Sequence, residues 1–124
     1  MRIVLSNIGT FGDINPLNIS HVKQVIYLFG GLDIGLQMPQ AWQGRSIWDK
    51  VDDHLGSWGG HDVWVVDYDA YGVWCVTWGE LQFITWEGFH WACDEAHALI
   101  VPDWVPPVGF DMAALKAALA LVTA

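Results

Sequence analysis

The sequence has few basic residues. Five lysines and arginines stand against fourteen aspartates and glutamates, which gives a formal net charge of −9. From Val51 to Leu115 there is no lysine or arginine, whereas the same stretch contains eleven acids. Proteins bind nucleic-acid backbones largely through cations that displace the counterions of the phosphates. The charge therefore argues against binding to nucleic acid or to an anionic membrane, and it favours a surface that attracts a basic partner.

Cysteine and long hydrophobic runs are also scarce. Cys75 and Cys93 are the two cysteines, and neither belongs to a CxxC pair, so the sequence contains no disulfide framework. Residues 1–5 lack the basic and apolar segments of a secretory signal, and no run approaches the ~20 apolar residues that a membrane span requires. Nucleotide-binding fingerprints are missing as well. We therefore expect a cytoplasmic protein with no cofactor and no membrane span.

Tryptophan, in contrast, is abundant. The chain has nine tryptophans among 124 residues, which is more than the core of one small domain should need. A tryptophan side chain buries a large area but requires a partner for its N–H, so it concentrates in cores and at interfaces. We expect one domain over residues 1–124, with some tryptophans exposed or in contact with another chain.

The hydrophobic periodicity predicts both helices and strands. Asn18 or Ser20 can cap a helix that continues to Phe29, and alternating apolar residues predict a strand over Leu32–Met38. Two further strands, His61–Tyr68 and Val73–Trp78, should form a hairpin around a tight turn. The other expected elements are edge strand 2–5, loop 9–16, strand 81–84, helix 85–96, strand 98–101 and a final helix from Asp111 to about Val122. This order predicts an α+β fold with a mostly antiparallel sheet and flanking helices.

Two segments resemble a known family. The stretch GGHDVWVVDYDAYGVWCVTWGELQFITW contains a histidine after two glycines, an apolar strand and a returning strand that ends in Trp-Gly, and CDEAHALI follows it. This pattern resembles the C-terminal half of papain-like cysteine peptidases, in particular a bacterial and phage branch akin to the bacteriocin-processing peptidases. The likeness extends over most of residues 13–123. It implies a papain-like domain that is N-terminally truncated relative to the family.

The resemblance implies a catalytic role for His61, as the imidazole that accepts the proton of a thiol nucleophile. Thr77 would be a weak orienter of that ring, since the family's asparagine is replaced by Val76. The family's nucleophile lies upstream of the histidine, where this chain has no cysteine; Cys75 and Cys93 follow His61 instead. The Gly of the family's V-G-Y is Asp67. We therefore expect His61 and Thr77 to be remnants of a lost catalytic site.

A metal site is a weaker alternative. His90, Cys93 and His97 are spaced three and four residues apart, so on one continuous helix they would share a face, and histidine with cysteine suits zinc. Termination of the helix near Ala96 would move His97 away from the other two. We therefore favour a structural role for these residues and expect no metal.

These observations predict a binding function. The expected protein is a catalytically inactive papain-like domain of phage or mobile-element origin that binds a protein partner or itself through an acidic, tryptophan-rich surface. Three alternatives remain open: a cysteine peptidase or amidase completed by another chain or an unexpected cysteine, a carbohydrate-binding module, and an inhibitor that mimics nucleic acid.

Overall fold

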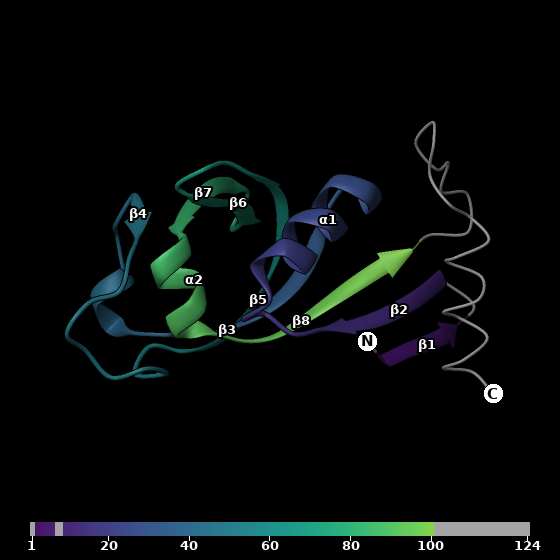
Figure 1. Ribbon diagram of the computed structural model, residues 1–124. Coiled ribbons are helices and arrows are strands. Elements are labelled where there is room, and N and C mark those ends of the chain that lie inside the picture. Colours follow the sequence, from purple (N-terminus) through teal and green to yellow (C-terminus); the bar gives the residue numbers. More distant parts are fainter. Residues whose placement is uncertain (1, 7–8, 101–124) are drawn as a thin grey trace.

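A computed structural model describes residues 2–6 and 9–100 of the chain. These residues form eight strands, two α-helices and a short 3₁₀ helix (Figure 1). In chain order they are β1 (Arg2–Ser6), β2 (Gly9–Ile14), α1 (Ile19–Phe29), β3 (Leu32–Met38), η1 (Gln40–Trp42), β4 (Ile47–Trp48), β5 (Gly59–Tyr68), β6 (Gly72–Thr77), β7 (Glu80–Thr85), α2 (Trp86–Ala92) and β8 (Cys93–Ile100).

The strands belong to one mixed sheet with the order β1-β2-β8-β3-β5-β6-β7-β4. All neighbours are antiparallel except β4 and β7, which are parallel. Strand β8 is last among the described elements but is inserted between β2 and β3, so it joins the N-terminal hairpin to the rest of the sheet. This insertion brings residues from both ends of the described chain together on one surface.

Strand β3 forms the centre of the core. Its side chains alternate, with Leu32, Ile34, Leu36 and Met38 buried on one face. Helix α1 packs on this part of the sheet through residues at helical spacing, namely Val22, Val25 and Ile26. Both helices lie above β3 and β8 in Figure 1, and α2 contacts β6 and β7 as well as β3 and β8. The helices thus occupy the side of the sheet toward which β6 and β7 curl.

The ends of α1 follow local capping rules. The side chain of Asn18 accepts a hydrogen bond from the backbone N–H of His21 at 3.2 Å, which confirms Asn18 as the N-cap. Gly30 ends the helix in the left-handed conformation, with φ of 77°, and its N–H donates to the carbonyl of Ile26. The sequence therefore predicts both ends of this helix correctly.

The hairpin of β5 and β6 is also confirmed. One carboxylate oxygen of Asp69 accepts hydrogen bonds from the N–H groups of Tyr71 and Gly72, so this aspartate stabilises the turn. Gly72 is required by close packing, since a Cβ atom there would collide with the carbonyl of Ile84 on β7. The ladder contains one bulge between Val65 and Asp67.

The predicted fold class is wrong. We expected an α+β domain corresponding to the C-terminal half of a papain-like peptidase, with a mostly antiparallel sheet and flanking helices. The described chain does form a mostly antiparallel sheet with helices beside it, but this is a single eight-stranded mixed sheet that includes a parallel β4–β7 pair, and nothing links it to half of a papain-like domain. Two segments differ from the prediction: residues 9–14, predicted as a loop, form β2, and residues 93–96, predicted as the end of a helix, already belong to the long strand β8, which was predicted only from residue 98.

The boundary between α2 and β8 lies earlier in the chain than predicted. A helix was predicted over residues 85–96, but α2 ends at Ala92 and Cys93 already begins β8 in extended conformation. Strand β8 is paired on both sides, with β2 and with β3, and these two ladders outweigh the helical preference of Ala and Glu.

The final helix predicted from Asp111 lies outside the described residues. Within the part of the chain that is described, no helix has the length and apolar character needed to cross a membrane.

Candidate functional site

The structure brings His61 and Thr77 together. His61 lies near the start of β5 and Thr77 at the end of β6, and these ends meet because the two strands are antiparallel. The ring Nε2 of His61 is 2.7 Å from the hydroxyl Oγ1 of Thr77, and either atom can donate depending on the tautomer of the ring. Thr77 is buried with 8% of its surface exposed. The hydroxyl therefore holds the imidazole in one orientation, and a catalytic or remnant role for the pair stays a prediction.

Trp78 covers the imidazole. Its indole stacks on the His61 ring with centroids 4.6 Å apart and planes 11° from parallel. Trp78 and Gly79 connect β6 to β7, and both have positive φ, 49° and 75°. A two-residue hairpin turn with two positive φ values is usually Asn-Gly or Gly-Gly, because a large side chain is strained there. Strained residues of this kind concentrate at functional sites. The conformation of Trp78 therefore favours a functional site around this residue.

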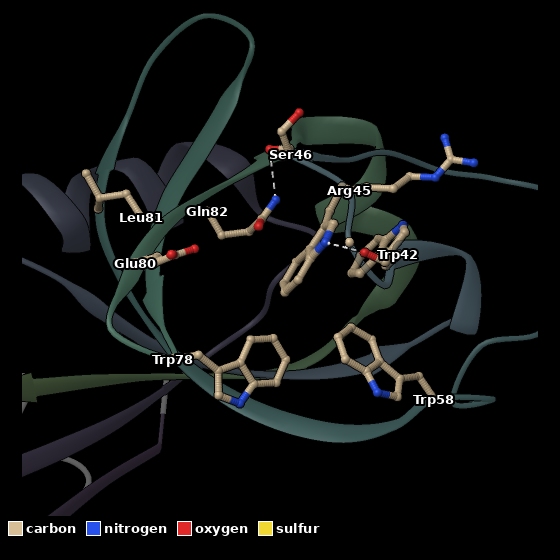
Figure 2. A pocket seen from close by; sticks show the side chains of 10 residues that line it. Trp42, Arg45, Ser46, Trp58, Trp78, Glu80, Leu81 and Gln82 are labelled. Carbon is tan, nitrogen blue, oxygen red and sulfur yellow. Dashed lines mark hydrogen bonds between the residues drawn. The ribbon is translucent and has the colours of Figure 1, made fainter.

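Beside Trp78 lies a cavity of about 500 Å³, which we call the tryptophan hollow (Figure 2). Its tryptophans come from four separate segments: Trp42 from η1, Trp48 from β4, Trp58 from the loop before β5, and Trp78 from the β6–β7 turn. Figure 2 shows Trp58 and Trp78 side by side at one end of the cavity. The remaining lining residues are Gly44, Arg45, Ser46, Glu80, Leu81 and Gln82.

Trp42 and Trp48 form a rigid inner part of the hollow. Their rings are stacked, with centroids 5.0 Å apart and planes 7° from parallel, and 0% and 2% of their surfaces are exposed. Both indole N–H groups are satisfied: Trp42 donates to the carbonyl of Asp49 at 2.8 Å and Trp48 to that of Trp42 at 3.0 Å. Buried and fully hydrogen-bonded rings have little freedom to move.

Trp58 and Trp78 form the outer part. Trp48 meets both edge-on, at interplanar angles of 87° and 80°, while Trp58 and Trp78 are tilted at 33° with centroids 5.2 Å apart. Trp78 is 62% exposed. Among the described residues, neither outer indole donates its N–H to a protein acceptor. The hollow thus has dry rings inside and accessible rings at its mouth.

A second cavity, of about 300 Å³, has His61 in its lining. It is lined by Gly35, Leu36, Gln37, Gly60, His61, Asp62, Asp94 and Glu95. Gln37 donates a hydrogen bond to Asp94 at 2.9 Å. Burial, a hydrogen bond to Asp62 and the charge of Asp62 raise the pKa of nearby Asp33 to about 7. This surface concentrates carboxylates whose charges already repel one another.

His97 belongs to the same carboxylate-rich surface. Its Nδ1 is 2.8 Å from Asp13 and its Nε2 is 3.5 Å from Glu95. Burial lowers the pKa of His97, but the contacts with these two carboxylates outweigh it and raise the pKa. The predicted alternative of a metal site on one helical face is wrong, because His90 lies in α2 while Cys93 and His97 lie in β8.

Neither cysteine is an activated thiol. Cys75 is 0% and Cys93 7% exposed, and burial raises the pKa of each to about 12. The Cys93 thiol donates to the carbonyl of Glu95 at 3.2 Å. Within the described chain, no hydrogen bond joins either sulfur to His61. At neutral pH both sulfurs are therefore protonated and shielded, whereas a nucleophile needs an accessible thiolate.

The hydrophobic pattern did not predict the tryptophan hollow. The high number of tryptophans signalled that some would be exposed, but it did not show which of them would meet. Trp42, Trp48 and Trp58 come from a very short helix, a two-residue strand and a loop, which are too short for periodicity to give the direction of a side chain.

Comparisons with known proteins do not identify the chain. A scan against protein-family models, a search of curated proteins and a search of solved structures found no match. The resemblance to cysteine peptidases therefore rests on the sequence pattern alone and stays a prediction.

Proposed function

We propose that this protein is a binding protein without catalytic activity of its own, which recognises a protein partner through an acidic, tryptophan-rich surface. The tryptophan hollow is the binding site in this proposal. Its partner is a different, basic chain rather than a second copy, because a formal charge of −9 on each copy opposes self-association. A cytoplasmic location, where both thiols would remain reduced, belongs to the same proposal.

The observation that carries this proposal is the convergence of four tryptophans from four segments around one open cavity. Tryptophan is the residue type most enriched among the energetically dominant contacts of protein interfaces. Two lining side chains of the cavity are large, apolar and exposed, since Leu81 and Trp78 each expose 62% of their surface. A preformed hollow with rigid aromatic rings lowers the ordering cost of binding.

The thiols and the imidazole support binding over catalysis. The pKa of each cysteine is raised to about 12 by burial, and the His61 ring is stacked on Trp78 and hydrogen-bonded to Thr77. A general base must reach the proton that it removes, and here Nε2 of His61 is hydrogen-bonded to the Thr77 hydroxyl. In this proposal, His61 supports Trp78 from behind and holds the outer ring in place.

A selection from a random-peptide display library on the immobilised protein tests the proposal. We expect enriched peptides to bind at least tenfold more weakly to Trp78→Asn, because this change removes the outer ring but keeps a residue that tolerates positive φ in the turn. Trp74→Asn is the matched control, since Trp74 is an exposed tryptophan on β6 that packs on Phe83 outside the hollow.

The selection has two outcomes that would count against the proposal. One is a library that yields no peptide binding above background. The other is a set of peptides that bind wild type and Trp78→Asn equally well but lose affinity with Trp74→Asn, because this would place the binding surface elsewhere.

A further inference from the structure

The tryptophan hollow lies where the pairing of two strands stops. Strands β4 and β7 are parallel, and Ile47 beside Phe83 is the first pair of their short ladder. Residues 44–46 and 80–82 directly precede this pair on the two strands, and both stretches line the hollow instead of continuing the ladder. The cavity therefore opens beside a part of β7 that has no neighbouring strand on this side among the described residues.

The side chain of Gln82 closes the end of the β4–β7 ladder. Its amide nitrogen donates to the carbonyl of Ser46 at 2.9 Å and to the carbonyl of Phe83 at 3.2 Å, and Figure 2 shows the first of these hydrogen bonds at the rim of the cavity. A side chain thus satisfies backbone carbonyls at the point where strand pairing ends. The residue before it, Leu81, has no such substitute in the described part of the chain.

The backbone groups of Leu81 face this open edge. A two-residue turn connects β6 to β7, so Thr77 and Glu80, which flank it, form a hydrogen-bonded pair. Hydrogen-bonded and non-hydrogen-bonded pairs alternate along an antiparallel ladder. The next pair, Val76 and Leu81, is therefore not hydrogen-bonded, and the N–H and C=O of Leu81 point away from β6. Within residues 2–6 and 9–100, neither group takes part in the β4–β7 ladder or in another backbone hydrogen bond.

The chemistry of the edge indicates what covers it. A free N–H and C=O on one strand are matched by the backbone of an extended chain that lies beside it. Glu80 is exposed on β7 next to these groups, and a charged residue on an edge opposes pairing between two copies of the same strand. A formal charge of −9 on each copy acts in the same direction. The edge therefore favours a different chain with basic residues.

We infer that the basic partner docks as an extended segment, which adds a strand to the sheet at the free edge of β7 and hydrogen-bonds to the N–H and C=O of Leu81. The inference rests on the proposed function, because it states in which conformation the partner enters the same site. Backbone hydrogen bonds fix the direction of the segment, and its side chains supply the specificity.

The two faces of the sheet then receive alternate side chains of the partner. Residues that are opposite each other on neighbouring strands lie on the same face, so the partner residue beside Leu81 contacts the exposed leucine side chain on the outer face. The residues before and after it point to the opposite face. Trp48 and its pair partner Ile84 are buried on that face, where the hollow lies. One of these two partner residues therefore inserts an apolar side chain into the hollow.

Hydrogen exchange of the ¹⁵N-labelled full chain tests whether the edge is free. The amide of Gln82 points to β6, whereas the amide of Leu81 points away from it. We expect the Leu81 amide to exchange at least 100-fold faster than the Gln82 amide in the free protein. The peptide most enriched in the display selection should slow the exchange of Leu81 at least tenfold. Equal protection of both amides in the free protein would overturn the inference, because the edge would already be covered.

A proline substitution removes the edge donor. Leu81→Pro lacks the outward N–H but leaves the ladder with β6 complete, because proline is tolerated in a strand where its nitrogen faces the free edge. We expect this variant to bind the most enriched display peptide at least tenfold more weakly than the matched control Leu81→Ala, which loses the same side chain and keeps the N–H. Circular dichroism verifies that both variants are folded.

Changes in the peptide test the same contact with the wild-type protein. The selected peptide is N-methylated at one position at a time, and methylation of the N–H that donates to the carbonyl of Leu81 should weaken binding at least tenfold, while methylation of the adjacent positions should have little effect. Binding that tolerates Leu81→Pro and N-methylation at every position would overturn the inference. The proposed function would still stand if that peptide requires Trp78. A selection that yields no peptide contradicts the proposed function itself, and the inference fails with it.

Discussion

Trp78 shows how one residue can combine an unfavourable backbone with a specific side-chain position. Its φ of 49° is strained for a large residue, yet its ring stacks on His61 and contacts Trp48 and Trp58. Substituting Asn at this position would suit the turn better but would remove the three ring contacts. The ring contacts of the side chain, and not the turn, account for a tryptophan at this position.

The two cysteine thiols are buried and should be unreactive in the folded protein. Both cysteines should react slowly with iodoacetamide in the folded protein, at least about 100-fold more slowly than in urea, because burial keeps them protonated and inaccessible. Labelling followed by mass spectrometry measures both rates, and the unfolded chain is the internal control. Fast labelling at about pH 6 that disappears in His61→Ala would instead indicate an activated thiol and a cysteine enzyme.

Among the elements, α2 depends on a single residue at its start. The Thr85 hydroxyl oxygen accepts a hydrogen bond from the N–H of Gly88 at 3.0 Å and donates its own hydrogen to Asp49 at 2.6 Å. Thr85 therefore caps the helix and links it to the segment that follows β4. This link matters for the site because Trp48, an inner ring of the hollow, is the last residue of β4.

Removing this cap should destabilise the fold. We expect Thr85→Ala to lower the free energy of unfolding by about 1 kcal/mol, the usual loss for an N-cap, with a further decrease from the hydrogen bond to Asp49. Thr85→Ser retains the hydroxyl and should remain close to wild type. Urea unfolding followed by circular dichroism measures both variants, and an unchanged midpoint in Thr85→Ala would contradict this account of α2.

The helices and strands show which parts of the fold the sequence predicts and which it does not. Periodicity predicted α1 and β3 with correct ends, because regular spacing and capping residues act locally. It predicted the end of β8 but failed at its start, where residues 93–96 were assigned to the preceding helix because Ala and Glu favour helix. Strand pairing with β2 and β3 decides that segment, and such long-range pairing is not visible in local sequence.

In the candidate site, too, the sequence predicts local contacts but not contacts between distant segments. The motif that suggested a peptidase correctly placed His61 beside Thr77, because both belong to one hairpin. The tryptophan hollow requires four segments to meet, and their relative positions depend on the order of the strands in the sheet. The number of tryptophans predicted that some rings would be exposed, but the sequence did not predict how these rings would be arranged.

For the whole molecule, the carboxylate-rich surface predicts a dependence of stability on pH. The pKa of Asp33 is raised from 3.8 to about 7, so between these values the folded state binds more protons than the unfolded state, and the free energy of unfolding falls as pH rises. The raised pKa of His97 acts in the same direction. Its stabilisation is complete below the ordinary value of 6.5 and is lost as pH rises through the higher folded value.

We therefore expect the protein to be more stable near pH 4 to 5 than near pH 8, with Asp33 contributing about 1 kcal/mol or less because solvent screens a partly exposed group. Asp33→Asn should flatten the dependence between about pH 4 and pH 7 while leaving the part due to His97. Asp52→Asn, at an exposed position, is the control. Urea midpoints across the pH range measure the effect, and a midpoint that rises steadily toward pH 8 in the wild type would contradict it.

The short hairpin that presents Trp78 has a consequence for the kinetics of recognition. Long recognition loops sample many arrangements, and only a fraction of encounters finds the competent one. The Trp78 ring is anchored on a two-residue turn and stacked on an imidazole. It should therefore already have its binding conformation at every encounter with a ligand. Association should then proceed in a single phase at a rate set by diffusion and charge attraction, while differences in affinity between ligands arise from how long each remains bound.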